Sequence, residues 1–151
     1  MRVRRMTFLE RIQEVMSGER PAMPFAGLVG YRVTVLEAGR ARVELDAGEQ
    51  HANPMGTVHG GALCAIADTA MGLAYGATLE EGEEFATLEL KINFLRAVQR
   101  ATLIAEAAVV QRGRSIGMTE CTITDEGGRL IAKATSTCMT RRGARALENG
   151  A

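Results

Sequence analysis

Residues 60–77 form the longest apolar stretch of the chain. They are rich in Ala, Leu and Met and poor in β-branched residues, which favours a helix. Because the apolar positions cover nearly every side of this helix, we expect a soluble protein to bury it completely. A second pattern, with apolar residues three and four positions apart over residues 7–17, predicts a short amphipathic N-terminal helix.

Six shorter runs have the pattern of strands. Two of them precede the long helix and form a plausible hairpin, and four follow it and are separated by short polar or glycine-containing segments. A connector is expected over residues 18–30, and the small, charged residues 141–151 read as a flexible tail. The predicted fold is therefore α+β, a single domain over residues 1–151 in which a long antiparallel sheet of about six strands wraps around the central helix. The predicted strands are residues 31–36, 40–46, 86–95, 101–111, 115–125 and 130–140.

Charge and composition narrow the class of partner. Lys+Arg and Asp+Glu both number 18, so the formal net charge is zero, which argues against nucleic acid or an anionic membrane as the main partner. No apolar segment follows the charged N-terminus, so we expect no signal peptide, and we expect no membrane span. The three cysteines are widely spaced and match neither a metal motif nor a disulfide set, which favours reduced thiols and a cytoplasmic location.

Asp68 is the first candidate for chemistry. A carboxylate in the middle of an apolar helix has a large desolvation cost unless another group pairs with it. A purely structural Asp, bonded to the backbone or to a facing Thr, remains an alternative.

The start of the same helix carries His59, Gly60 and Gly61. Two glycines leave N–H groups that a ligand can approach closely, and the helix dipole favours negative charge at this end. Such donors can form an oxyanion hole, to which the amide of Asn53, on a turn six residues upstream, could contribute. Tight packing of the helix end, and an ordinary turn role for Asn53, remain alternatives.

Other chemistries have weaker support in the sequence. His51 and His59 are eight residues apart across a turn, so together with Asp68 they do not give fixed metal geometry, and we expect no metal. No G-x-S-x-G nucleophile motif is present. Cys64 has no neighbouring base in the sequence and belongs to an apolar helix, where a thiol is inert.

The segment from His51 to Asp68 closely resembles the hotdog-fold thioesterases, in particular their phenylacetate-pathway (PaaI-like) branch. The resemblance extends from about residue 24 to about residue 140 and includes the strand at residues 87–96. It implies a hotdog fold and an acyl-CoA thioesterase that needs no cofactor, since CoA is part of the substrate. The branch motif H-x-N-x-x-G-x-x-H-G-G, followed seven residues later by Asp, is matched without a gap by His51, Asn53, Gly56, His59, Gly60, Gly61 and Asp68.

The resemblance also implies roles for individual residues. Asp68 would be the general base or nucleophile, and Gly60 N–H with Asn53 would polarise the thioester carbonyl. His59 would support their loop, and Thr87 would help to hold water, although Thr87 is equally consistent with a packed strand residue. The candidates for substrate binding are Gly61, His51, Arg112 and Arg114, the arginines being taken from a set at strand ends and loops that could meet CoA phosphates: Arg96, Arg112, Arg114, Arg141 and Arg142.

The spacing along the helix predicts an oligomer. Gly60 and Asp68 are eight residues apart, about 12 Å along a helix axis, too far for one chain to place both on one thioester. Two antiparallel copies of the helix could do so, so we expect a homodimer at minimum and a tetramer, as in the resembling enzymes. Two other functions remain open: a hotdog hydratase or dehydratase acting through a His, and a non-catalytic acyl-CoA-binding module. The acyl group is not specified by the sequence.

Overall fold

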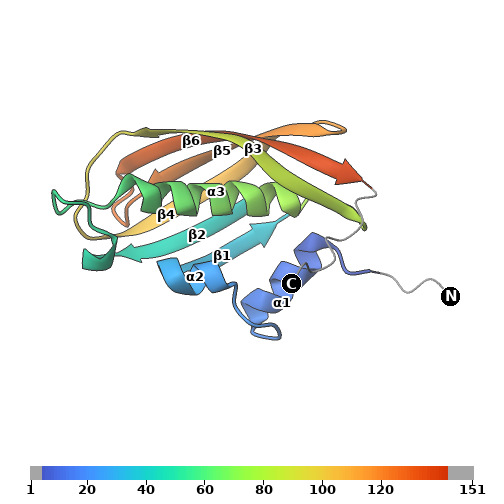
Figure 1. Ribbon diagram of the computed structural model, residues 1–151, viewed down its shortest axis with the longest axis horizontal. Coiled ribbons are helices and arrows are strands. Elements are labelled where there is room, and N and C mark those ends of the chain that lie inside the picture. Colours follow the sequence, from blue (N-terminus) through green and yellow to red (C-terminus); the bar gives the residue numbers. More distant parts are fainter. Residues whose placement is uncertain (1–4, 143–151) are drawn as a thin grey trace, which may run out of the picture.

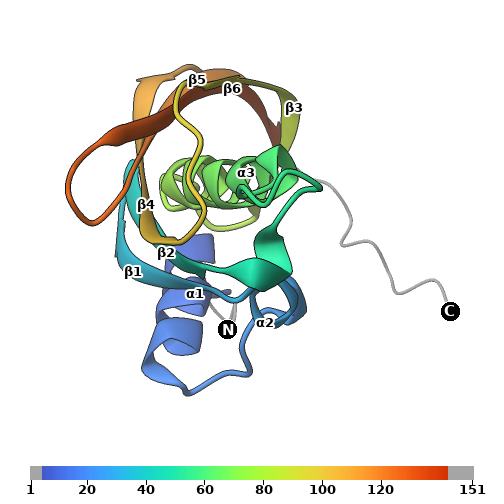
Figure 2. The same cartoon turned by 90° about the vertical axis from the view of Figure 1, so that its left-hand side faces the viewer.

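The computed structural model describes residues 5–142 as a curved antiparallel sheet around a long helix (Figure 1). The strand order is β1-β2-β4-β5-β6-β3, so β1 and β3 are the edges. Figure 2 shows the sheet curling around α3, with α1 and α2 on the side of β1 and β2. The elements are α1 Phe8–Ser17, α2 Pro24–Val29, β1 Tyr31–Glu37, β2 Arg40–Ala47, a 3-10 turn Glu49–His51, α3 Gly60–Gly76, β3 Glu83–Phe94, β4 Ala101–Arg112, β5 Ile116–Thr124 and β6 Leu130–Arg142.

The core lies between α3 and the concave face of the sheet. Alternate residues of the central strands are buried, because successive side chains of a strand point to opposite faces. In β2 the buried residues are Ala41, Val43, Leu45 and Ala47, and α3 packs against all six strands. The prediction of a six-stranded antiparallel sheet wrapped around one central helix is confirmed.

Within one chain, the expected complete burial of α3 is not reached in its first half. The second half is buried, but Gly61 and Asp68 are exposed, and Cys64 and Ala65 between them are half-buried. These positions are three and four residues apart and form one face of the helix, which we call the open face of α3. Apolar composition alone could not reveal this face, because Ala, Gly and Cys are compatible with either environment.

The N-terminal region contains two helices rather than one. Thr7 caps α1 through a capping box with Glu10, and Gly18 ends the helix at a φ of 81°. The six-residue α2, with Pro24 in its first turn, lies within residues 18–30, where only a connector was expected. None of the helices in residues 5–142 is long and apolar enough to cross a membrane.

The C-terminal strand is longer than predicted. Arg141 and Arg142 were assigned to a flexible tail, but they extend β6 and pair with Glu84 and Glu83 of β3. Arg142 also forms an ion pair with Glu83 at 2.8 Å. Its partner is almost sixty residues away in the sequence, so local composition gave no sign of it. The remaining residues of the predicted tail, 143–151, lie outside the described part of the chain.

Candidate active site

The loop before α3 is held by the side chain of Asn53. Its Oδ1 accepts hydrogen bonds from Met55 N at 3.0 Å and Thr57 N at 3.1 Å, and its Nδ2 donates to Thr57 Oγ1 at 2.8 Å. Gly56 turns the loop at a φ of 76°. An amide nitrogen carries two hydrogens, so one N–H of Asn53 is available beyond the bond to Thr57.

The two histidines both support this loop. His51 Nδ1 accepts from Gly48 N at 3.1 Å, and its Nε2 lies 2.7 Å from Val29 O. Both ring nitrogens of His51 are therefore used within the chain, which leaves the ring no nitrogen for the substrate contact expected from the sequence. His59 Nδ1 accepts the N–H of Gly61 at 2.7 Å and so acts as the N-cap of α3.

Gly60 is the first residue of α3. The first N–H groups of a helix have no intrahelical partner, and among the described residues no acceptor is bonded to this one. A Cβ at this position would lie 2.9 Å from Cζ of Phe94, so a larger residue here would have to displace the Phe94 ring at the end of β3. Gly60 thus presents a bare donor at the positive end of α3.

Asn53 and Gly60 share a cavity of about 390 Å³, which we call the glycine cavity. Its other walls come mainly from the apolar end of β3 and the segment that follows it. The structure therefore brings together the two proposed carbonyl-polarising groups.

Asp68 lies in a different cavity, of about 560 Å³, which we call the aspartate cavity. Thr87 lines it, as the sequence interpretation required, and so does Gly61. The other lining residues include Phe25, from the unpredicted α2, and the carboxylate Glu89, from β3, neither of which was expected from the sequence. No local pattern could have found them, because both reach the cavity through the folding of distant segments.

An irregularity of β3 allows Thr87 to line the aspartate cavity. The pairing of β3 with β6 shifts between Thr87 and Glu89, which leaves Leu88 as the extra residue of a β-bulge. Before the bulge Phe85 packs against Tyr75 of α3, and after it Leu90 packs against the core. The bulge thus changes which alternate positions face α3, and Thr87 lies on the helix side.

The thiol beside Asp68 is unsuited to nucleophilic attack. Burial raises the pKa of Cys64, and the neighbouring Asp68 carboxylate raises it further. A thiol held protonated is a poor nucleophile. Burial likewise raises the pKa of Cys121 to about 12.

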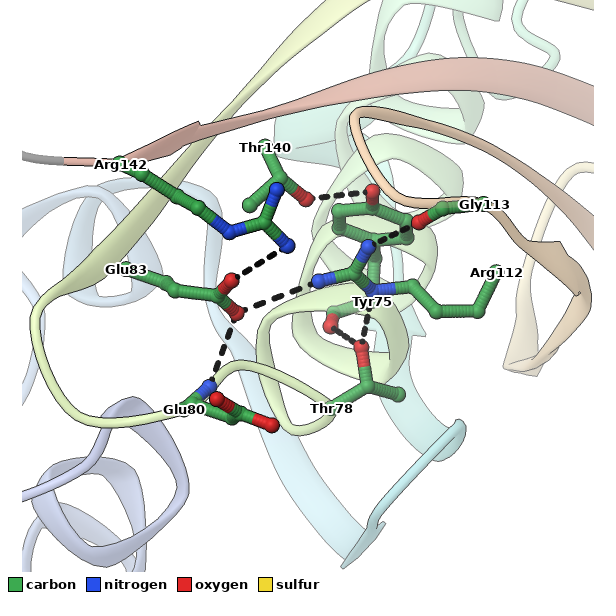
Figure 3. A network of polar contacts seen from close by, with 8 residues as sticks. All are labelled: Tyr75, Thr78, Glu80, Glu83, Arg112, Gly113, Thr140 and Arg142. Atoms are coloured by element: carbon green, nitrogen blue, oxygen red, sulfur yellow. Dashed lines mark hydrogen bonds and ion pairs between the residues drawn. The ribbon is translucent and has the colours of Figure 1, made fainter.

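Arg112 lies far from both cavities. Figure 3 shows it in a polar network at the C-terminal end of α3, about two turns beyond Asp68. Its guanidinium lies 4.9 Å from the centre of the Tyr75 ring, donates to Thr78 Oγ1 at 3.1 Å and forms an ion pair with Glu83 at 3.3 Å. Each of its three side-chain nitrogens donates to a group of the same chain, and Arg114, in the adjoining loop after β4, is exposed at the same end. Neither arginine is brought to Asp68 or Gly60 within one chain.

Metal ligands do not gather in the described residues. No three His, Cys, Asp or Glu side chains between residues 5 and 142 are placed to hold a metal ion. His51 and His59 use ring nitrogens to fix the backbone, as described above.

Comparison with known proteins places this arrangement in a family. The profile of the "Thioesterase superfamily" matches residues 55–132, more than half of the chain and the part that carries Gly60, Asp68 and Thr87. The chain belongs to the thioesterase superfamily. It is therefore a thioester hydrolase, and its helix wrapped in an antiparallel sheet is the predicted hotdog fold.

Individual relatives of this thioesterase agree with the PaaI-like resemblance. It is similar to 1,4-dihydroxy-2-naphthoyl-CoA hydrolase of Listeria monocytogenes, with 28% identity over 76% of this chain and 93% of the relative. It is also similar to acyl-coenzyme A thioesterase 13 of Pongo abelii, with 25% identity over 85% and 93% of the two chains. Among solved structures, a phenylacetic acid degradation-related protein from Ralstonia eutropha superposes with a TM-score of 0.77 and 33% identity, covering 84% of this thioesterase and 97% of that chain.

Proposed function

We propose that this thioesterase hydrolyses acyl-CoA, with Asn53 and Gly60 of one chain polarising the thioester carbonyl and Asp68 of a second chain acting on it. The observation that carries the proposal is the pairing of a bare Gly60 N–H with an exposed Asp68 on the same apolar helix. Covering the open face would remove Asp68 from water, and a buried carboxylate without a partner is costly, which favours a role for Asp68 at a substrate.

The glycine cavity would stabilise the charge that develops on the thioester during attack. As water or a carboxylate attacks the thioester carbon, negative charge develops on the carbonyl oxygen. Gly60 N–H and one N–H of Asn53 can donate to that oxygen, and the positive end of α3 stabilises it further. His59 supports this geometry by fixing Gly61 and hence the first turn of the helix.

Asp68 would activate the attacking water or attack the thioester itself. Acting as a general base, it takes a proton from water as the oxygen of that water bonds to the carbonyl carbon. The carbon–sulfur bond then breaks, the carboxylic acid forms and CoA leaves as the thiol after receiving the proton. Direct attack by the Asp68 carboxylate would instead give a mixed anhydride that water hydrolyses. Thr87, in the same cavity, has a hydroxyl suited to holding the water in either route.

The distance between the two cavities supports a shared site. Gly60 and Asp68 are separated by about 12 Å along α3, whereas both must come within about 3 Å of reacting atoms. A second antiparallel chain would bring its Asp68 to the first chain's Gly60. The open face of α3 and the adjoining edge strand β3 suit such an interface, because Leu88, Phe94 and Leu95 are each more than half exposed there.

The hydratase alternative has less support. It needs a His side chain free to transfer protons beside the substrate. His51 uses both ring nitrogens in backbone contacts, and His59 uses Nδ1 to cap α3. A non-catalytic acyl-CoA-binding module remains distinguishable by experiment, since it would bind acyl-CoA without releasing CoA.

Thiol release from a panel of aryl- and medium-chain acyl-CoAs tests the assignment of Asp68. Asp68→Asn should lower kcat by at least about 100-fold, because it removes the base or nucleophile while preserving shape. Glu89→Gln is the matched control, since it neutralises the other carboxylate of the same cavity and should retain most activity. Wild-type turnover by Asp68→Asn would reduce Asp68 to a structural residue.

Complementation tests whether the site is shared. Asn53→Ala and Asp68→Asn chains, each nearly inactive alone, are refolded together, and mixed dimers are verified by differential tagging. A mixed dimer of this kind contains one intact site, so activity should return to a sizeable fraction of wild type. Mixed dimers that remain as inactive as the parents would show that both groups act within one chain.

A further inference from the structure

A third cavity adjoins the glycine cavity. It has a volume of about 610 Å³, and the two cavities share the segment Arg96, Ala97 and Val98 as a common wall. Val58, in the loop that carries Asn53, donates its N–H to Val98 O at 2.8 Å. The third cavity is therefore attached directly to the loop that polarises the thioester carbonyl.

The walls of this cavity carry three arginines, Arg96, Arg100 and Arg129, against a single carboxylate, Glu49. This excess is local, since the whole chain has a formal net charge of zero. No other residue of the described chain accepts from the guanidinium of Arg96, and its backbone is anchored by the bond from Arg96 N to Ile131 O at 3.1 Å. We call these three residues the arginine cluster.

The carboxylates near the cluster, Glu49 and Asp125, do not occupy all of its guanidinium donors, so an anion can still bind. Arg100 lies 3.6 Å from Glu49, and both side chains are largely exposed, so the pair contributes little and can be exchanged. Arg129 binds the buried Asp125 through Nε at 2.6 Å. Asp125 is itself fixed by the N–H groups of Gly127 and Arg129, so it positions the Arg129 side chain, whose other guanidinium donors can still bind a ligand.

Several other arginines have partners elsewhere. Arg112 and Arg142 share Glu83 at the far end of α3, and Arg32 and Arg42 pair with Glu44, Asp46 and Glu106 on β1, β2 and β4. The cluster combines an excess of guanidinium groups with a position beside Val98, which is hydrogen-bonded to the carbonyl-polarising loop.

We infer that the arginine cluster binds the phosphate groups of CoA, and that it belongs to the same chain as the Gly60 that polarises the thioester. This inference rests on the proposed function. Guanidinium groups match phosphate oxygens in charge and geometry. The part of CoA between the thioester and the phosphates then lies across the wall formed by Arg96 to Val98. The cluster replaces Arg112 and Arg114 as the assigned phosphate contact.

Binding at the cluster affects substrate affinity rather than the chemical step. The phosphates are remote from the carbonyl and keep their charge throughout the reaction. Their contacts are equally strong in the ground and transition states, so losing them raises KM and leaves kcat unchanged. A thioester of the same acyl group on N-acetylcysteamine lacks phosphates and should be indifferent to the cluster.

The test compares these two substrates in two double variants. Arg96→Gln with Arg100→Gln removes two charges from the cluster but spares the Arg129–Asp125 pair. Arg32→Gln with Arg42→Gln removes the same charge from exposed pairs on the sheet and serves as the control. The cluster variant should raise the KM for acyl-CoA by at least about tenfold with unchanged kcat, and leave kcat/KM for the N-acetylcysteamine thioester unchanged. The control variant should leave KM and kcat unchanged for both substrates.

Calorimetric titration with CoA separates failure of this inference from failure of the proposed function. If wild type cleaves both thioesters and the cluster variant keeps the wild-type KM for acyl-CoA, the inference is wrong while the function stands. If wild type cleaves neither, the proposed function fails, and the inference then stands only if wild type binds CoA and the cluster variant does not. Equal loss of activity on both substrates would assign the arginines to folding or catalysis and overturn the inference.

Discussion

The N–H groups of the two adjacent glycines at the start of α3 differ in their hydrogen bonding. The N–H of Gly61 is bound by His59 Nδ1, whereas no described residue accepts from the N–H of Gly60. One N–H thus fixes the helix start and the other remains available to a substrate. The availability of a donor therefore depends on which neighbouring group has an acceptor nearby, which the sequence Gly-Gly does not reveal.

The cap at His59 gives a prediction at this scale. His59→Ala should lower the free energy of unfolding by about 1 kcal/mol, because it removes the acceptor of Gly61 N–H. It should also lower kcat, since the first turn of α3 and the Gly60 donor lose their fixed position. Chemical denaturation and thiol-release kinetics measure the two effects.

His59→Asn is the matched variant, because an Asn side chain can also accept from the second N–H of a helix. It should recover most of the lost stability and activity. If His59→Asn is stable but as inactive as His59→Ala, the ring itself takes part in the chemistry.

At the scale of elements, the sequence predicted regular features well. The helix at residues 60–77 ends one residue earlier in the structure, and the six strands occur near their expected positions, because alternation and apolar runs reflect burial directly. Asn53 and Gly60, which the motif assigns to carbonyl polarisation, line one cavity, and Asp68 and Thr87 line another. These groups are either close in sequence or lie on neighbouring elements.

Features that depend on tertiary contact were beyond the sequence. The bulge at Leu88 arises from the mismatch between β3 and β6, and the arginine cluster joins segments about thirty residues apart. Arg112 looked like a substrate contact because it ends a strand, yet its partner Glu83 lies 29 residues away. Propensity and motif spacing describe neighbours along the chain, so these pairings have no signal in them.

The network around Glu83 ties the start of β3 to the ends of β4 and β6, as Figure 3 shows. Burial alone would raise the pKa of Glu83, but the N–H of Glu80, Arg142 and Arg112 together hold it below its usual value. The folded protein thus favours the carboxylate form. Its contribution is present above the pKa of the unfolded chain and is lost as pH falls through the lower folded pKa.

Glu83→Gln should therefore destabilise the protein by about 2 kcal/mol at pH 7, because charged hydrogen bonds to two arginines are weakened. The difference from wild type should shrink as the pH falls from the pKa of the unfolded chain through the lowered pKa of the folded Glu83 carboxyl, because the wild-type group then becomes protonated as well. Urea unfolding at several pH values measures this difference. A difference that stays constant with pH would mean that Glu83 acts through packing rather than charge.

At the scale of the whole molecule, the described chain leaves one apolar surface uncovered. The open face of α3 and the edge strand β3 lie beside each other around the aspartate cavity. An edge strand with large exposed apolar residues invites pairing with another strand. Under the proposed function, a second copy of the chain covers this surface and completes the site, so that assembly and catalysis would share one interface.

A charge placed on the open face of α3 should disrupt both dimer formation and catalysis. Ala65→Arg would put a guanidinium between Gly61 and Asp68, where a partner helix is expected to pack. We expect a monomer by light scattering and activity at least about 100-fold lower, since loss of a buried partner removes one half of each site. The secondary structure seen by circular dichroism should be retained.

Ala38→Arg adds the same side chain in the exposed turn between β1 and β2 and should leave mass and activity unchanged. A dimeric but inactive Ala65→Arg would place the interface elsewhere and limit the effect to the cavity. A fully active monomer would contradict the shared site.

The separation of Gly60 from Asp68 along α3 also has a consequence for reaction order. With each site completed by a second chain, the rate at high dilution depends on the square of the enzyme concentration and becomes linear only when dimers predominate. Dilution of the enzyme would then lower its specific activity as dimers dissociate, although every chain is intact and no regulator is present. The turnover rate per chain would depend on the concentration of the protein itself.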